Sequence, residues 1–232
     1  MQLPRGDEYN QAIQNPKHCF DDNELKNCRV ELNKIGLPKP YSGGFTTTYQ
    51  LINGSGKYAV RCFTRDIKDL EKRYKEINNF FVGNKSQYFV NAGYVAQGIK
   101  INSKYYPIIK MKWLEGEPLN IFLDKNYRNT QIIKNVIVEF QKLVTELEKL
   151  GIAHGDIQHG NIIVNGGKLY LIDYDGMYFP NLSGLVSNEV GHPNFQHPQR
   201  TSKHYNNKID RFASLVIYTA LKAIMLKPQV WA

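Results

Sequence analysis

Cysteine is scarce in this chain of 232 residues, and the three that occur argue against two kinds of small protein. Cys19, Cys28 and Cys62 are an odd number and show no CxxC spacing. A disulfide framework needs paired cysteines, and a cysteine zinc site needs short paired spacings. The sequence therefore favours neither a disulfide-stapled domain nor a zinc site built from cysteine.

Long apolar runs are missing as well. The longest apolar stretch, residues 212–226, is interrupted by Lys222 and is shorter than a helix that crosses a bilayer. The N-terminal segment MQLPRGDEYN lacks the basic and then apolar layout of a secretory signal. We therefore expect no membrane partner and a cytoplasmic location.

Positive charge is in excess, but it is not clustered. The formal net charge is +9, and no run of five or more basic residues occurs. Such an excess favours anionic partners, whereas a dedicated nucleic-acid surface usually concentrates its lysines and arginines. The charge pattern thus favours a nucleotide as partner and makes nucleic acid an unexpected one.

The hydrophobic content, 42%, is enough for one large domain or two small lobes. Two β-rich runs flank the turn NGSG at 53–56 and predict a hairpin. Apolar residues at helical spacing predict a helix over 66–81, and further strands are expected at 88–96 and 105–111. The first part of the chain is therefore expected to run β-β-α-β-β.

The second part has a different pattern. A long amphipathic helix is predicted over 130–150, with Gly151 as its C-terminal cap. Two short apolar runs separated by the turn NGGK then predict a second hairpin. Residues 209–226 predict a last helix that is apolar on nearly all sides, so we expect it to be buried.

Polar residues that can bind metal or transfer protons occur in two turns, one on either side of the second hairpin. The sequence HGDIQHGN occupies 154–161, and DYDG follows the hairpin at 173–176. This order brings Asp156, Asn161 and Asp173 to one end of a small β-ribbon. Carboxylate and amide oxygens suit Mg²⁺, and the remaining aspartate can accept a proton from an attacking hydroxyl. The spacing is typical of phosphoryl transfer in kinases.

On these motifs the chain resembles the protein-kinase-like superfamily. Asp156 and Asn161 match the aspartate and asparagine of the catalytic loop, and Asp173 matches the metal-binding aspartate of the D-F-G motif. The segment GHPNFQHPQ at 191–199 resembles the end of an activation segment. Asp210 resembles the aspartate that holds the catalytic loop from below, and the catalytic loop resembles that of an uncharacterised bacterial branch with HGDLQHGN.

The resemblance covers residues 39–226 and implies an α+β, two-lobed fold. The implied parts are an N-terminal extension at 1–38, a small β-rich N-lobe with its hinge at 39–114, and a mainly helical C-lobe at 115–232. This C-lobe would be incomplete, because it stops after the helix equivalent to αF. One face of that helix would then be exposed to a protein partner or to self-association.

ATP and Mg²⁺ are the cofactors that the resemblance implies. KYAVRCF resembles the third strand of the N-lobe, and MKWLEG resembles the hinge. The resemblance makes Arg61 the phosphate clamp, with Glu76 as its helix partner and Glu71 as the alternative. The other implied nucleotide-binding residues are Gly43, Gly44, Ala59, Met111 and Ile163. His154 is expected to pack the catalytic loop against the core.

Four departures from the kinase pattern leave two functions open. Arg61 replaces the usual lysine, the glycine-rich loop is poor, and Gly155 and Gln158 stand where protein kinases carry basic residues. The first function is an ATP- and Mg²⁺-dependent phosphotransferase that acts on a hydroxyl of a protein or of a small molecule. The second is a weak or inactive pseudokinase that senses nucleotide or serves as a scaffold.

Overall fold

The structure is a computed structural model that describes residues 3–43, 46–83 and 86–231. It divides the chain into two compact units. The first unit is Met1–Asn84 with Asn91–Trp113, and the second is Lys85–Val90 with Leu114–Ala232. Within the described ranges, no helix is both long enough and apolar enough to cross a membrane.

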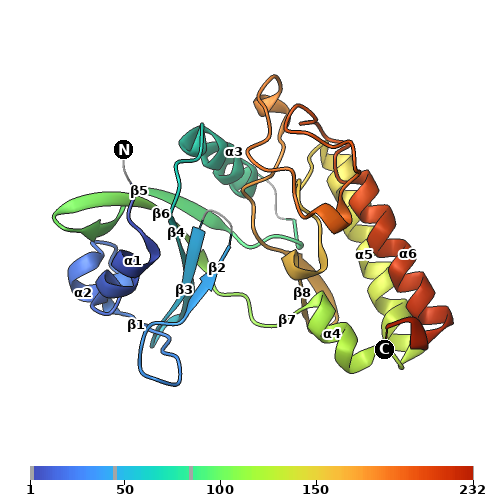
Figure 1. The fold of residues 1–232 in the computed structure, drawn as a ribbon, viewed down its shortest axis with the longest axis horizontal. Helices are drawn as coiled ribbons and strands as arrows, with labels where there is room; N and C mark the ends of the chain where they lie inside the picture. Colours follow the sequence, from blue (N-terminus) through green and yellow to red (C-terminus); the bar gives the residue numbers. More distant parts are fainter. Residues whose placement is uncertain (1–2, 44–45, 84–85, 232) are drawn as a thin grey trace. The chain divides into compact units, whose positions relative to one another are not determined.

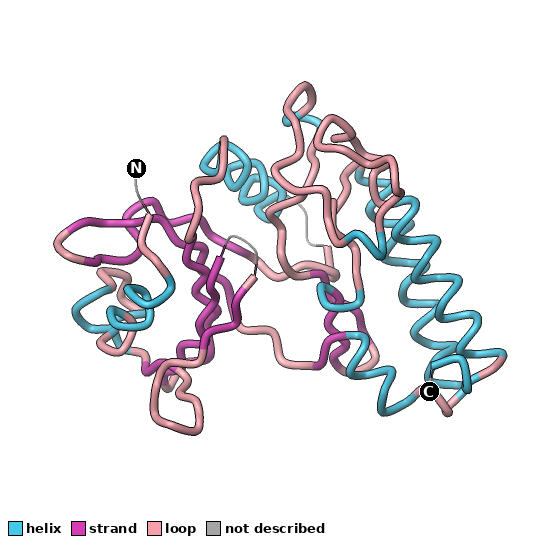
Figure 2. The backbone as a smooth tube through the Cα atoms, in the orientation of Figure 1, coloured by secondary structure: helices cyan, strands magenta, loops and turns pink. Residues whose placement is uncertain are grey.

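An antiparallel sheet forms the centre of the first unit. Its strands are β1 (Arg29–Val30), β2 (Pro40–Ser42), β3 (Thr46–Asn53), β4 (Gly56–Phe63), β5 (Ala92–Ile101) and β6 (Lys104–Lys112). The order is β1-β3-β4-β6-β5, with β2 also paired to β3, and Figure 2 shows the long strands side by side. The predicted hairpin is confirmed, and the Asn53 side chain accepts the N–H groups of Ser55 and Gly56 in its turn.

The N-terminal segment supplies part of the core of this unit. It contains α1 (Gly6–Ala12), α2 (Pro16–Cys19) and a 3₁₀ turn at Leu25–Asn27. Tyr9, Ile13 and Phe20 are buried in one cluster with Tyr49 and Val60 of the sheet. One face of β3 and β4 is therefore covered by residues that the sequence assigned to an extension.

The opposite face of the sheet carries the predicted nucleotide-binding residues. Directly paired residues of antiparallel strands project from the same face. Ala59 is paired with Met111, and Arg61 is paired with Thr48 and Ile109. Helix α3 (Leu70–Gly83), which follows β4 in the sequence, packs against β5. It begins at Leu70 and not at 66, because Asp69 has a φ of 57°, which a helix does not accommodate.

The second unit combines a small sheet with two long helices. The order is β7 (Glu117–Pro118), α4 (Leu119–Asn126), α5 (Thr130–Leu150), β8 (Ile162–Asn165), β9 (Lys168–Leu171) and α6 (Arg211–Leu226), and short 3₁₀ turns lie between these elements and after α6. The prediction for α5 is confirmed: Asn129 caps its first turn and Gly151 is left-handed at its end. The β7-β8-β9 sheet contains the second predicted hairpin.

One expectation about a flanking segment was wrong. The strand predicted at 88–96 begins only at Ala92, since Phe89 forms a parallel bridge with Leu171 in the second unit. Helix α6 was expected to be buried with one face left exposed, and Leu215 is 62% exposed and Leu226 is 77% exposed. α6 packs along α5, as Figure 1 shows, and a single neighbouring helix covers only one side of it.

Candidate active site

The loop between α5 and β8 is held from below by one buried carboxylate. Asp210 directly precedes α6 and accepts the backbone N–H of His154 and, at 2.8 Å, that of Gly155. Burial raises the pKa of the Asp210 carboxyl, while the neighbouring His154, these N–H groups and the positive charge of Arg200 oppose the rise. The structure thus places Asp210 where the sequence predicted it, beneath the loop.

His154 joins this loop to the segment that follows β9. Its ring is fully buried, and Nε2 lies 2.9 Å from the carbonyl oxygen of Ile172. Its Nδ1 accepts the backbone N–H of Asp156 at 3.3 Å, so the proton of the neutral ring is on Nε2 and is donated to Ile172. The imidazole therefore supports two neighbours of the site without entering it.

Both oxygens of the Asp156 carboxylate accept hydrogen bonds. Oδ2 accepts from the side-chain amides of Gln158 at 2.8 Å and Asn161 at 2.9 Å. Oδ1 accepts the backbone N–H of His192 at 2.7 Å. A carboxylate held by three donors has a fixed direction, and its remaining lone-pair positions can still meet an incoming hydroxyl.

Asn161 is oriented so that its amide oxygen remains available. Its Nδ2 donates to the backbone oxygen and to the carboxylate of Asp156, both at 2.9 Å. The backbone carbonyl of Asn161 accepts the N–H of Ile172 at 3.0 Å, and Asp173 follows Ile172 in the chain. The sequence-predicted trio Asp156, Asn161 and Asp173 is therefore brought together within the second unit.

The backbone at Asp173 is in a sparsely populated conformation. Its φ is 68°, which is uncommon for a residue with a side chain and is often found at functional sites. Tyr174, which follows, is buried, and its hydroxyl accepts the N–H of Val90 at 2.9 Å and lies 2.9 Å from the carbonyl oxygen of Leu171. This anchored tyrosine fixes the turn that presents Asp173.

The donor set at this turn fits a magnesium ion. Asn161 offers an amide oxygen and Asp173 a half-buried carboxylate, and Mg²⁺ commonly takes one or two such ligands and keeps several waters. Over the parts of the chain that the structure describes, no group of three or more His, Cys, Asp and Glu side chains could hold a metal. The arrangement thus suits a cation that shares its coordination with phosphate oxygens.

The first unit buries Arg61 in the sheet. Its side chain is buried in β4, and its Nε donates to the hydroxyl of Thr46 at 2.9 Å. A strand residue that only faces water would be exposed. The surrounding sheet therefore holds the Arg61 side chain in a defined position. Ala59 and Met111 lie on the same face as register partners, whereas Ile163 belongs to β8 of the second unit.

The predicted glycine loop lies between β2 and β3. The N–H of Gly43 donates to the carbonyl of Thr46 at 2.9 Å, and the residue is exposed. Gly44 lies outside the described residues. Gly43 therefore lies next to Thr46, whose hydroxyl binds Arg61.

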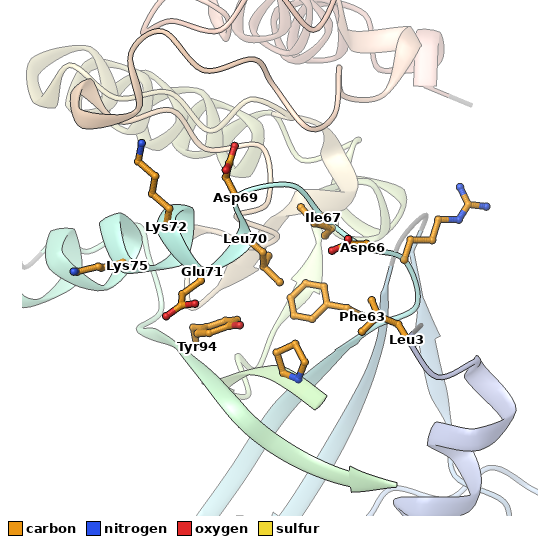
Figure 3. Close-up of a pocket in the computed structure, with 12 residues that line it drawn as sticks. Leu3, Phe63, Asp66, Ile67, Asp69, Leu70, Glu71, Lys72, Lys75 and Tyr94 are labelled. Atoms are coloured by element: carbon orange, nitrogen blue, oxygen red, sulfur yellow. The ribbon is translucent and has the colours of Figure 1, made fainter. Parts of the chain in front are cut away.

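Of the two candidate glutamates on α3, Glu71 is exposed and lines a cavity of about 630 Å³. Figure 3 shows its carboxylate beside the ring of Tyr94. Burial and this carboxylate raise the pKa of the Tyr94 hydroxyl. Glu76 is half-buried and lies on the second turn of the same helix.

Several residues of the second unit that matter to the site were not predicted from the sequence. Gln158 and the backbone of His192 bind the Asp156 carboxylate directly. Both residues lie in motifs that the sequence analysis identified. Spacing along the sequence does not show which carboxylate a backbone N–H or the Gln158 amide will contact. Gly155, also noted as a departure, has a φ of 87°, and a Cβ there would lie 2.2 Å from the Gly176 oxygen.

Comparison with known proteins gives partial matches. No sequence profile of a protein family matches the chain. A KEOPS complex subunit Bud32 from Pyrococcus abyssi is 33% identical over 88 residues, which are 38% of this chain and 37% of that protein.

Two further relatives are probable bifunctional tRNA threonylcarbamoyladenosine biosynthesis proteins. The protein from Methanosarcina mazei is 31% identical over 104 residues, and that from Methanosarcina barkeri is 30% identical over 105 residues. Each match covers 45% of this chain and 17% of the relative. The three relatives are archaeal, so the predicted bacterial branch stays a prediction. With the α+β architecture, these similarities support a place for this chain in the kinase-like superfamily.

Proposed function

We propose that the protein is a phosphotransferase that uses ATP and Mg²⁺ to phosphorylate a hydroxyl group. The observation that carries the proposal is the arrangement of Asp156, whose carboxylate is held by three donors beside Asn161 and the strained turn of Asp173. Asn161 and Asp173 would hold Mg²⁺, which supplies positive charge to the phosphate oxygens when it is bound. Asp156 would accept the proton of the acceptor hydroxyl.

Nucleotide binding is assigned to both units. In the first unit, we propose that Arg61 pairs with phosphate, that Glu76 orients it, and that Gly43 and Gly44 leave room for the phosphate chain. Ala59 and Met111 of the first unit, and Ile163 of the second, would contact the base. The burial of Arg61 and its bond to Thr46 support this proposal, because a preorganised guanidinium loses little side-chain entropy on binding an anion.

The acceptor is proposed only as a class, a protein serine or threonine or a small-molecule hydroxyl. One relative is named as a subunit of a complex, and two are named for a tRNA modification. A protein partner for this chain is therefore part of the proposal, as is a cytoplasmic location. The chain's basic residues are scattered, and we do not propose nucleic acid as a direct ligand.

A pseudokinase remains the second candidate, because Arg61 is already bonded within its own sheet. A scaffold needs only the fold and nucleotide binding. An enzyme needs in addition a base that acts in the transition state, so the two functions differ in what loss of the Asp156 carboxylate does.

The decisive experiment compares binding with turnover. We expect ATP to raise the melting temperature only when Mg²⁺ is present, by a shift that corresponds to about 2.7 kcal/mol at 100 times Kd. Asp173→Ala should abolish the shift, because it removes a metal ligand. Asp156→Asn should keep it and should lower phosphate release or transfer from radiolabelled ATP by about 10²- to 10⁴-fold.

Two other outcomes would decide against parts of this proposal. A wild-type protein that binds Mg-ATP and transfers no phosphate would be a pseudokinase. A melting curve unaffected by millimolar Mg-ATP would exclude the phosphotransferase and a pseudokinase that senses nucleotide.

A further inference from the structure

A half-buried arginine close to the catalytic loop has no role in the function proposed above. Arg200 follows the segment 191–199 and donates from Nη1 to Oε1 of Gln196. Its Nε and Nη2 are inaccessible to solvent and have no hydrogen-bond partner among the residues that the structure describes. Burying a donor without a partner costs about 1 to 3 kcal/mol, and more for a charged group. Packing alone does not explain why a guanidinium occupies this place.

Gln196 connects this arginine to the proposed base. Gln196 is buried, and its Nε2 likewise lacks a partner. A Cβ atom on Gly191 would lie 2.6 Å from Gln196 Nε2 and 2.7 Å from Asp156 Oδ1. Only the absence of a side chain at Gly191, whose φ is 76°, lets these two polar groups approach one another. Gln196 is therefore bound to Arg200 through its Oε1, and its Nε2 lies beside Gly191, as the Asp156 carboxylate does.

Three carboxylates provide the electrostatic compensation that hydrogen bonds do not. Burial lowers the pKa of the Arg200 guanidinium, and the negative charges of Asp210, Asp156 and Glu189 oppose that change. Asp210 and Asp156 are themselves buried. A guanidinium with two buried nitrogens next to two buried anions lowers the cost of keeping these carboxylates charged.

The catalytic loop has no cation of its own in the positions where protein kinases carry one. Those positions hold Gly155 and Gln158. Position 155 does not accommodate a basic side chain, because any Cβ there would meet the backbone of Gly176. A charge that balances Asp156 and Asp210 must therefore come from another segment.

We propose that Arg200 is a positioning residue, the internal counter-ion of the catalytic loop, which holds Gln196 against the Asp156 carboxylate. Its role in catalysis rests on the proposed function, whereas its role as counter-ion does not. The two roles are tested by separate measurements.

The counter-ion role is tested by a double-mutant cycle in chemical unfolding. Arg200→Gln should lower the denaturation midpoint, and Asp156→Asn should reduce that loss by at least half, because the unbalanced negative charge is gone. Arg200→Lys should lie closer to wild type than Arg200→Gln. Lys203→Gln, which removes an equal charge from an exposed neighbour, should leave the midpoint unchanged. Equal losses in the two backgrounds would overturn the proposal.

The counter-ion role can still be tested if a variant does not fold. If Arg200→Gln is insoluble, the cycle is run with Arg200→Lys, which keeps the charge and changes the geometry. The proposal then requires Arg200→Lys to fold with a small midpoint shift, and an insoluble Arg200→Lys would overturn it.

The positioning role is tested by steady-state kinetics with Mg-ATP. Arg200→Gln should lower kcat by about 10-fold or more with KM for ATP nearly unchanged, since ground-state binding does not involve this side chain. Adding Gln158→Lys, which returns a cation to the Asp156 carboxylate, should recover part of kcat. Unchanged kcat in Arg200→Gln would overturn this role. A wild-type protein without turnover would refute the proposed enzyme, and the unfolding cycle would still decide whether Arg200 is the counter-ion.

Discussion

Single residues at this site are chosen by backbone geometry as much as by chemistry. Gly155 and Gly191 both have positive φ, and a Cβ would meet the backbone of Gly176 at the first and the side chains of Gln196 and Asp156 at the second. Gly155 explains why the arginine of protein kinases is missing, because the chain brings the carbonyl of Gly176 into its place. A departure from the family pattern is thus a packing requirement at this position.

The first prediction concerns Gly155. Gly155→Ala should lower the free energy of unfolding by at least about 2 kcal/mol, because the substitution combines a left-handed backbone with a contact of 2.2 Å. Gly166→Ala is the matched control: its φ is also positive, at 57°, but a Cβ there meets nothing within 4 Å. We expect the control to cost about 1 kcal/mol. Equal losses in urea unfolding would show that the contact with Gly176 has no weight.

At the scale of elements, the N-terminal segment behaves as part of the sheet it covers. Lys110 of β6 contacts Asp22 at 2.6 Å and Glu24 at 2.7 Å. Burial alone would raise the pKa of Asp22, but the hydrogen bonds from Lys110 and Leu25 outweigh it and hold that pKa below its usual value. Burial alone would likewise lower the pKa of Lys110, and its two carboxylate partners hold it above the usual value.

The second prediction follows from these two shifts. A lowered acid pKa stabilises the fold above about pH 4, and a raised lysine pKa stabilises it below about pH 10. Lys110→Met should therefore lose about 1 kcal/mol, a value already reduced for partial exposure, across the range between these limits. The difference from wild type should shrink as the pH falls through the folded pKa of Asp22 or rises through that of Lys110.

Thermal unfolding at a series of pH values measures this difference. Lys104→Met, which removes an exposed lysine from the start of the same strand, should show no such window. A loss in Lys110→Met that does not change with pH would mean that the side chain contributes packing and not charge.

At the scale of the whole molecule, α6 leaves apolar side chains uncovered. Phe212, Leu215, Leu226 and Val230 are exposed on α6 and just after it. Exposed apolar patches often mark contacts with other proteins. These exposed residues lie on the helix for which the sequence predicted contact with a protein partner or a second copy.

The third prediction concerns this surface. Leu215→Lys should change the stability of the chain by no more than about 0.5 kcal/mol, because the side chain is mostly in water. We expect wild type to sediment faster as concentration rises and Leu215→Lys to sediment as a monomer. Ile217→Ala, at a buried position of the same helix, should cost about 2 to 5 kcal/mol. Sedimentation of wild type that is independent of concentration would exclude self-association.

The sequence by itself determined the elements with strong local signals. The hairpin at 53–56, helix α5 and the second hairpin were predictable, because turn residues, caps and apolar periodicity act over a few positions. The meeting of Asp156, Asn161 and Asp173 was predictable too, since a hairpin returns the chain to its starting end. Which side of α6 is exposed was not, because an apolar helix lacks a preferred side and its exposure depends on how many neighbours cover it.

Only the tertiary structure decided what surrounds the catalytic loop. The N–H of His192 reaches Asp156 across 36 positions, and Asp210 reaches the N–H of His154 across 56. Such contacts depend on where long loops return, and no local pattern records that. Arg200 shows the same limit, because in the sequence it is one of 30 basic residues. It is distinguished only by two buried guanidinium nitrogens that have no hydrogen-bond partner among the described residues, and by the carboxylates near them. Short-range order follows from neighbouring residues, whereas the electrostatic balance of a buried site is set by residues distant along the chain.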